Sequence, residues 1–397
     1  RLIDGMEGKV VHEWDVATVQ RGGEKGDKVP RGAMQLGCTF IKGDVPVAVG
    51  YNGQIVVMPL PSSVGLSSSA EGIENPLVLA GHQAPISAMT FGSPGSNAIY
   101  TADTDGVIVE WDGASGKAKG RVANANEEDP DITGQVHSGA TVTSLAFTSN
   151  DGTLYSAGWD DYVRTTEGLV CNDKLKMEAQ PNKMTAGTSL VVVMTVDGLV
   201  LIKDKKAVSE LIKLPYAATA VYLSKDDSML YVGGDDCNIY VYTVSPDGSG
   251  ANPLAESHVI KGGHLKPVQS FALSPDGTHL AAADSRDVCI YATSDYSTVV
   301  GKGRWCYHLQ RIGCLSWSPD GSVIASGGND DNIFLWCPAK KTKRVKYQFA
   351  HRGRDGVELC GWPGWRLDAG IGGCGRVREL VGRGKGCKGE VWIMSKS

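Results

Sequence analysis

The sequence lacks any hydrophobic run long enough to cross a bilayer as a helix. About 18 apolar residues are needed for that, and the best candidate, residues 189–202, is interrupted by Asp197-Gly198 and fits two paired strands better. The charge balance is also small: a net charge of −5 predicts neither nucleic acid nor an anionic membrane as the partner. The hydrophobic fraction of 42% and the charged fraction of 21% are typical of a globular protein.

Paired cysteines and other ligand patterns are missing too. The ten cysteines are scattered singly, without a CxxC pair, which favours reduced thiols in a cytosolic protein. No HxxxH pattern occurs, so the sequence predicts no metal site and no cofactor. Gly116-Lys117 is followed by Ala118, where a phosphate-binding loop needs a hydroxyl, and the GxGxG stretch at 382–386 follows no βαβ pattern.

What the sequence does contain is a repeated hairpin. Each copy has a polar turn, a strand, an Asp-bearing turn and a second strand that ends in Trp, Tyr or a substitute. A single hairpin of this kind cannot bury its apolar face. The copies are "GSNAIYTADTDGVIVEWD" (95–112), "SNDGTLYSAGWDDYVRTT" (149–166), "SKDDSMLYVGGDDCNIYVYTV" (224–244), "SPDGTHLAAADSRDVCIYA" (274–292) and "SPDGSVIASGGNDDNIFLWC" (318–337).

Histidines and two further strands complete each repeat. The histidines at matching offsets are His82, His137, His264, His308 and His351. Four strands at a pitch of about 40–50 residues, with GH and WD marks, are the signature of a WD40 β-propeller. The last-strand positions are Trp111, Thr166, Lys203, Tyr242, Tyr291 and Trp336, and a degenerate seventh unit ends near Leu380. We therefore expect an all-β, seven-bladed ring, whose closure removes exposed sheet edges.

The polar marks of the repeats predict buried hydrogen-bonded sets. The sets are His82, Thr101, Asp105 and Trp111 in one repeat, and His308, Ser326, Asp330 and Trp336 in another; Asp160, Asp197 and Asp236 are predicted to occupy the same turn elsewhere. These groups resemble a His–Asp–Ser catalytic triad, but their recurrence around the ring favours a structural role. We predict no catalytic residue and no enzymatic activity.

The strongest charge run lies after Trp336. It comprises Lys340, Lys341, Lys343, Arg344 and Lys346. Lysines often protect an edge strand, so a solvated edge is one interpretation. The other is a patch that binds an acidic protein surface.

The order of the atypical repeats resembles the second propeller of the actin-interacting protein 1 family. The stretches that carry the likeness are 36–58, 81–112, 142–166, 190–204, 221–244 and 312–336. Two shared departures are the most specific: "DDYVR" ends in Thr-Thr instead of Trp-Asp, and the short "DGLVLIKD" repeat lacks both GH and WD. The resemblance implies two linked seven-bladed propellers in the complete protein, of which this chain is a fragment.

The predicted domain boundaries follow from that resemblance. Residues 1–60 are expected to be the terminal blades of a truncated first propeller, and 61–76 a linker. Residues 77–380 are expected to form the seven-bladed propeller, and 381–397 a basic, glycine-rich tail. The last blade departs from the family pattern, with Gly373 near the turn-aspartate position and Leu380 in place of Trp.

The resemblance also implies a function. It is that of a non-enzymatic protein of the cytoplasm and the actin cytoskeleton, monomeric, which binds actin filaments and cooperates with cofilin (ADF) in severing and disassembling them, without nucleic acid or membrane partners. The alternatives are a general WD40 interaction scaffold with no actin role and, from a third class, a propeller enzyme with a site in its central channel.

Overall fold

The computed structural model of the chain describes one long segment and several separate strands. The structure describes residues 81–124, 135–245, 253–340 and 344–347. Within these ranges it leaves out residues 83, 94–95, 114–116, 138 and 331, and outside them it describes strands only. The chain forms two compact units, residues 1–83 with 126–133, and residues 84–125 with 134–397. Among the described residues, no helix is long and apolar enough to span a membrane.

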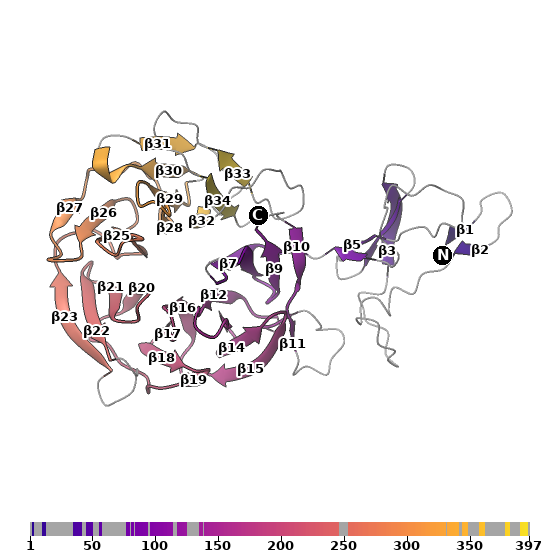
Figure 1. Cartoon of the computed structure of the whole chain (residues 1–397), viewed down its shortest axis with the longest axis horizontal. Helices are drawn as coiled ribbons and strands as arrows, with labels where there is room; N and C mark the ends of the chain where they lie inside the picture. The colour runs from indigo at the N-terminus through magenta and orange to yellow at the C-terminus, as the bar shows by residue number, and fades with distance from the viewer. Residues whose placement is uncertain are drawn as a thin grey trace. The chain divides into compact units, whose positions relative to one another are not determined.

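The larger unit contains a β-propeller, as the repeats predict (Figure 1). Its first three blades are each built from four consecutive antiparallel strands. Blade 1 is β7 (Ile86–Phe91), β8 (Ala98–Asp103), β9 (Ile108–Asp112) and β10 (Lys117–Arg121). Blade 2 is β12 (Val142–Phe147), β13 (Leu154–Gly158), β14 (Tyr162–Glu167) and β15 (Val170–Lys176), with β11 (Ala123–Asn124) added parallel to β15. Blade 3 is β16 (Pro181–Ala186), β17 (Leu190–Thr195), β18 (Leu199–Lys203) and β19 (Lys206–Ala207).

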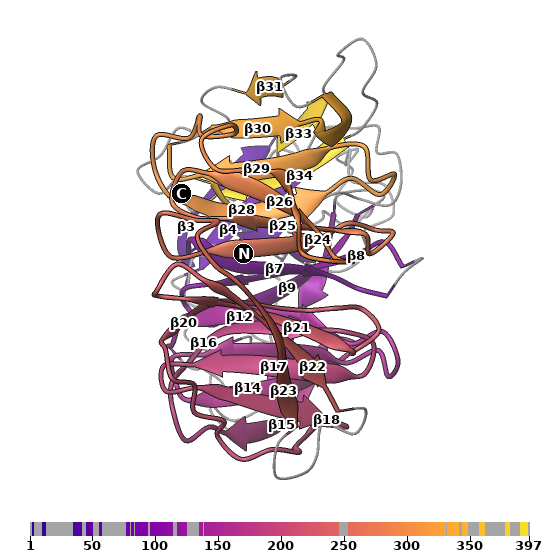
Figure 2. The same ribbon diagram turned by 90° about the vertical axis from the view of Figure 1, so that its left-hand side faces the viewer.

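Three further blades continue the ring. Blade 4 is β20 (Ala218–Leu223), β21 (Met229–Gly234), β22 (Ile239–Val244) and β23 (Leu254–Ile260). Blade 5 is β24 (Ser270–Leu273), β25 (His279–Ala283), β26 (Val288–Ala292) and β27 (Thr298–Val300). Blade 6 is β28 (Ile312–Trp317), β29 (Ile324–Gly328), β30 (Ile333–Trp336) and β31 (Arg344–Tyr347), with the short 3-10 helix η3 (Pro338–Lys340) before its last strand. Figure 2 shows the strands crossing the ring from one face to the other.

The expected count of seven blades is wrong for the part of the chain that is described, which holds six. After blade 6 there is a three-stranded sheet of β32 (Val357–Gly361), β34 (Glu390–Ser395) and β33 (Arg378–Val381), in that order. β32 lies beside β28 of blade 6 and β7 of blade 1. The central strand, β34, comes from the stretch predicted to be a tail, "EVWIMS", whose apolar and β-branched residues favour a strand.

The smaller unit holds two sheets. One pairs β1 (Leu2–Ile3) with β2 (Val10–His12), and the other orders β3 (Gln35–Ile41), β4 (Val45–Gly50), β5 (Ile55–Val57) and β6 (Leu77–Leu79). The predicted linker, 61–76, lies outside the described residues. The strand that follows the predicted linker, β6, pairs with β5 of the smaller unit. The propeller was predicted to begin at residue 77, whereas the first segment of the smaller compact unit extends to Gln83.

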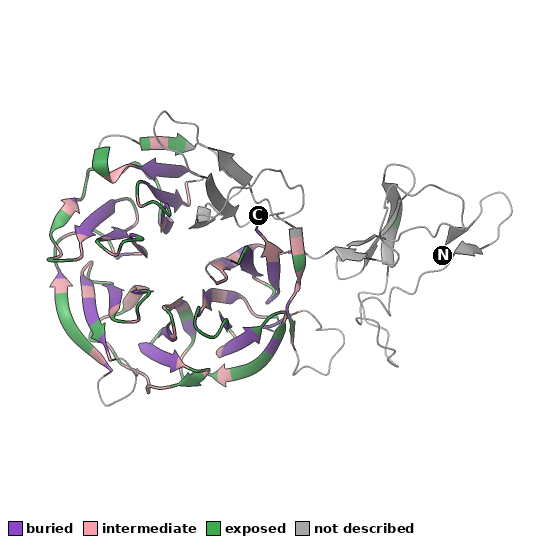
Figure 3. Ribbon diagram, viewed as in Figure 1, coloured by how far each residue is buried: buried purple, intermediate pink, exposed green. Residues whose placement is uncertain are grey.

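The hydrophobic core of the propeller consists of separate layers, each lying between two neighbouring blades. Five apolar clusters occur among the described residues, and each joins two successive blades. Inner and middle strands are therefore covered on both faces, as in β8 and β17, which are buried along their whole length. The outer strands β15 and β23 are mostly exposed (Figure 3). This explains why "LVVVMT" is a continuous apolar run and not an alternating one.

The predicted Ser-Pro-Asp-Gly turn closes the first hairpin of blade 6 through side chains. The Ser318 hydroxyl donates to Asp320 Oδ1 over 2.5 Å, and the Val323 N–H donates to Ser318 Oγ over 3.0 Å. Gly321 has a φ of 68°, a conformation that glycine adopts without a steric penalty. In the matching turn of blade 5, Ser274 donates to Asp276 in the same way.

Candidate functional site

The four polar residues predicted for blade 6 lie together. His308 Nδ1 lies 3.0 Å from Asp330 Oδ1, and His308 Nε2 lies 2.8 Å from Ser326 Oγ. The Trp336 indole N–H donates to the same Ser326 oxygen over 2.8 Å. These hydrogen bonds connect His308, in the loop before β28, with Ser326 on β29, Trp336 on β30 and Asp330 in the turn between β29 and β30. Because Ser326 and His308 are fully buried, no substrate has access to them, and the arrangement stabilises the blade.

The hydrogen bonds of this set stabilise the ionised form of Asp330 in the folded state. Burial by itself would raise the pKa of its carboxyl, but hydrogen bonds from His308, Asn332 and the Leu309 N–H outweigh burial and hold the pKa well below its usual value. The ionised carboxylate is thus part of the native structure.

Blade 1 uses a different aspartate from the one that the sequence predicted. The Trp111 indole N–H donates to Thr101 Oγ1 over 2.7 Å, and His82 is 4% exposed. Asp105, however, is exposed. Asp103 is the buried carboxylate, and its Oδ1 accepts the N–H groups of Asp105 (3.0 Å) and Val107 (2.9 Å). At the end of β8, Asp103 is positioned to cap the turn, and Asp105 at its tip is directed to solvent.

Blade 2 contains a buried ionic cluster. His137 Nε2 lies 2.9 Å from Ser156 Oγ, and His137 Nδ1 lies 2.8 Å from Asp160 Oδ1. Arg164 pairs with Asp160 Oδ2, and its Nη1 lies 2.7 Å from His137 Nδ1. Burial by itself would raise the pKa of the Asp160 carboxyl, but the hydrogen bonds and charge interactions with His137 and the Arg164 guanidinium outweigh burial and bring the pKa to about 2. Thr166 occupies the tryptophan position and is buried.

Blades 3 and 4 lack the histidine sets. In blade 3, Asp197 is exposed, and the turn is held by Thr195, whose hydroxyl donates to the Gly198 carbonyl over 3.0 Å. In blade 4, Asp236 accepts hydrogen bonds from the Asn238 side chain (2.7 Å) and the Tyr240 hydroxyl (2.6 Å). Asp236 therefore orders its turn, and Asp197 makes no such contact within the described residues.

One face of the ring gathers exposed apolar side chains. Successive strands of a blade run antiparallel, so the turn between its second and third strands emerges on the same side as the loop to the next blade. The Asn329 N–H in one such turn donates to the Arg311 carbonyl in the loop before β28 over 2.8 Å. We call this side the loop face; its exposed large apolar residues are Trp159, Val196, Leu265, Tyr307 and Leu309, at 57, 65, 67, 43 and 73% exposure. They are five of the six such residues in the described part of the chain.

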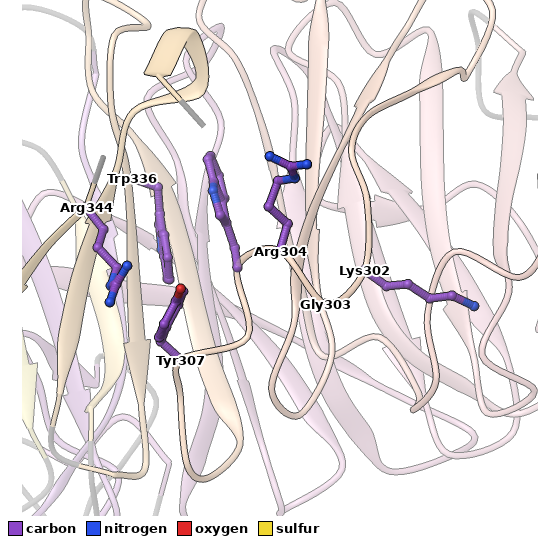
Figure 4. A pocket seen from close by; sticks show the side chains of 7 residues that line it. Lys302, Gly303, Arg304, Tyr307, Trp336 and Arg344 are labelled. Atoms are coloured by element: carbon purple, nitrogen blue, oxygen red, sulfur yellow. The ribbon is translucent and has the colours of Figure 1, made fainter. Parts of the chain in front are cut away.

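A hollow of about 460 Å³ lies where the loop from β27 crosses toward β28 (Figure 4). We call it the cationic hollow; it is lined by Lys302, Gly303, Arg304, Trp305, Tyr307, Trp336 and Arg344. Three of these side chains are cationic and none is acidic. Aromatic rings form the rest of its wall, with Trp305 and Trp336 stacked at 5.1 Å between ring centroids.

The predicted basic run is only partly described. Lys340 is exposed in η3, and Arg344 and Lys346 are exposed on β31. Lys341 and Lys343 lie outside the described residues. Of the three described residues of the run, only Arg344 lines the cationic hollow.

Sequence reasoning missed the other two cations of the hollow, Lys302 and Arg304. The available signal was the short stretch "KGRW" (302–305), in which basic residues directly precede a tryptophan between two strands. Such a stretch is too short to stand out as a charge run.

Metal binding and disulfide bonding are the remaining kinds of candidate chemistry among the described residues. Among the described residues, no three His, Cys, Asp or Glu side chains form a group that would hold a metal ion. The seven cysteines that the structure describes are free thiols.

Comparison with protein families identifies four of the repeats. The family model "WD domain, G-beta repeat" matches residues 74–112, 131–165, 256–291 and 303–337. Those ranges contain the histidine-bearing sets of blades 1, 2, 5 and 6. Blade 3 and most of blade 4, where the Thr195 hydroxyl and the Tyr240–Asp236 pair hold the turns instead, lie outside the matches.

Relatives of known name are similar over most of the chain. Actin-interacting protein 1 of Drosophila melanogaster is 28% identical over 80% of this chain and 48% of its own length. WD repeat-containing protein 1 of Xenopus tropicalis is 29% identical over 89% of this chain and 54% of its own length. Actin-interacting protein 1 of Caenorhabditis elegans is 26% identical over 81% of this chain and 49% of its own length. The predicted resemblance to the actin-interacting protein 1 family is thereby confirmed, and the chain spans about half the length of the curated relatives it matches.

Proposed function

We propose that the chain is part of an actin-filament-binding WD-repeat protein that cooperates with cofilin to promote filament severing and disassembly. The observation that carries the proposal is the likeness, over most of the chain, to relatives named actin-interacting protein 1. The protein would act without catalysis or a cofactor, as a monomer in the cytoplasm at the actin cytoskeleton, and without nucleic acid or membrane partners. In this proposal the larger unit is the second of two propellers, and the smaller unit belongs to the end of the first.

The mechanism is differential binding. A ligand shifts an equilibrium between two filament states only if it binds one of them more tightly. The protein must therefore prefer the cofilin-decorated filament, or its freshly exposed end, over the bare filament. A propeller suits this role because its hydrogen-bonded blades are rigid, so little ordering free energy is lost on binding.

The loop face supports the assignment of the contact surface. Its exposed side chains include Trp159 and Leu309, and large apolar groups lose unfavourable hydration when a partner covers them. The loop that carries Leu309 is hydrogen-bonded to the neighbouring turn of blade 6, by the 2.9 Å bond from the Leu309 N–H to Asp330. A partner on this face would meet preorganised apolar anchors.

Co-sedimentation with actin filaments tests the proposal. We expect the chain to pellet with cofilin-decorated filaments and to pellet less with bare filaments. Trp159→Ser and Leu309→Ser should each reduce the pelleted fraction several-fold, since an apolar anchor at the centre of an interface is typically worth at least about 1–2 kcal/mol.

Val170→Ser is the matched control, because Val170 is 41% exposed but begins β15, away from the loop face. A general WD40 scaffold would stay in the supernatant with both kinds of filament, and that result would refute the actin proposal. If the wild type and the three variants pellet equally with decorated filaments, the contact surface is not the loop face.

A further inference from the structure

We propose that the cationic hollow binds an acidic peptide segment of a partner protein, with its carboxylates paired to Arg304 and Arg344. This inference goes beyond the proposed function, because it requires no filament. It rests on the charge, the aromatic wall and the fixed loop of the hollow.

The charge of the hollow is uncompensated. Lys302 donates to the Gly262 carbonyl over 3.0 Å, but within the described part of the chain neither Arg304 nor Arg344 has an acidic partner. Both arginines are exposed. Clustered like charges raise the electrostatic energy of the free protein, and an anionic ligand lowers it. The chain as a whole carries a net charge of −5, so the local charge of the hollow is opposite in sign to that of the protein.

The aromatic wall orients Arg344. Its guanidinium carbon lies 3.6 Å from the centroid of the Tyr307 ring, so the guanidinium is close against the ring face. Stacking occupies the faces of a guanidinium and leaves the N–H groups at its edges available, and these form a fork that matches a carboxylate. Tyr307 is itself close to Trp336, with 6.0 Å between the ring centroids. Arg344 is thus preorganised for bidentate binding.

The loop that carries Arg304 is also held in place. Gly303 has a φ of 78°, and its N–H donates to Asp287 Oδ1 over 3.0 Å. On the other side of Arg304, the Trp305 carbonyl accepts the Val288 N–H over 3.2 Å, and the Trp305 side chain is 1% exposed. Arg304 therefore projects from a short segment anchored at both ends, beside the hollow (Figure 4).

A peptide fits these features better than the other polyanions. Nucleic acids require an extended basic stripe that follows many phosphates, whereas the hollow offers three cations around one depression. A depression of about 460 Å³ accommodates a few side chains, and exposed Tyr307 offers an apolar surface beside the cations. The ligand class is therefore a short segment rich in Asp or Glu.

The test is a titration of the complete chain with fluorescein-labelled hexaglutamate, followed by fluorescence anisotropy, with hexaglutamine as the uncharged probe. We expect hexaglutamate to bind more tightly, and added salt to weaken it because exposed ion pairs are screened. Arg304→Gln and Arg344→Gln should each weaken binding about tenfold, as expected for the loss of a charge-assisted hydrogen bond. Arg344→Lys, which keeps the charge but loses the fork, should give an intermediate loss.

Lys340→Gln is the matched control: it removes a neighbouring exposed charge that belongs to the same basic run but does not line the hollow. It should bind like the wild type. Thermal unfolding checks each variant, and Arg304→Gln, at an exposed position, keeps the test valid if Arg344→Gln does not fold. Equal affinity of the wild type for both peptides, or wild-type binding by Arg304→Gln, would overturn the proposal. Since the assay contains no actin, its failure leaves the filament proposal standing.

Discussion

Blades 5 and 6 are neighbours with the same four-strand plan, but their buried polar groups are satisfied to different degrees. In blade 6, Ser326 joins His308 to Trp336. In blade 5, Ala282 stands at the serine position and Tyr291 at the tryptophan position, as their strand pairing shows. As a result, His264 Nε2 and the Tyr291 hydroxyl are buried without a hydrogen-bond partner within the described residues.

Comparing the polar sets of blades 5 and 6 shows that a blade can form without the serine hydroxyl while it keeps the aspartate that caps the turn. Blade 5 keeps a His–Asp contact, with His264 Nδ1 3.3 Å from Asp284 Oδ2, and Asp284 Oδ1 still accepts two N–H groups of its turn, from Arg286 and Asp287. The fold therefore tolerates the loss of the hydroxyl while the turn cap remains. Each buried polar atom left unpaired costs about 1–3 kcal/mol, so blade 5 should contribute less to stability than blade 6.

The largest expected effect comes from removing the hydroxyl of blade 6. Ser326→Ala leaves His308 and the Trp336 indole N–H without their common partner, and should lower the free energy of unfolding by about 3 kcal/mol. Urea unfolding followed by circular dichroism measures this. Ser285→Ala, a half-buried serine in the turn of blade 5, should change the free energy by less than about 0.5 kcal/mol. Equal effects of the two substitutions would contradict the comparison.

A smaller effect is expected from the carboxylate of blade 6. Because the folded state lowers the pKa of Asp330, its stabilisation is present above the unfolded pKa, near 3.8, and is lost as the pH falls below that value. Asp330→Asn should cost about 2 kcal/mol at pH 7, and the gap between variant and wild type should narrow as the pH is lowered from about 4 toward 2. Urea unfolding at several pH values tests this. A gap that stays constant with pH would show that the charge of Asp330 does not stabilise the fold.

The smallest effect should be a gain in blade 5. Ala282→Ser introduces a hydroxyl beside His264 Nε2 and Tyr291, and should raise the free energy of unfolding by about 1 kcal/mol if it pairs with either. Ala281→Ser, at the next position along β25, is the control, because successive side chains of a strand point to opposite faces. Destabilisation by both substitutions would mean that the site is too tightly packed for an oxygen atom.

Local features of the propeller could be predicted from the sequence because they depend on neighbouring residues. The Ser-Pro-Asp-Gly turn at Ser318 and the buried run of β17 both follow from short stretches. The choice of Asp105 over Asp103 failed because counting along the repeat does not reveal which carboxylate reaches the turn amides. The predicted number of blades was wrong for a related reason. β34 pairs with β32 and β33, and the sequence does not reveal such pairing between distant segments.

The sequence by itself determined the repeating unit: its turns, its continuous apolar strands, its histidine positions and its likeness to a family. These are encoded within about 40 residues, where local propensity and hydrophobic pattern decide. Only the tertiary structure decided which side chains of separate segments line one hollow, such as Arg304 and Arg344 with Tyr307. Arg304 and Tyr307 lie in the loop before β28 and Arg344 lies on β31, so their approach depends on how that loop packs against the outer strand of blade 6.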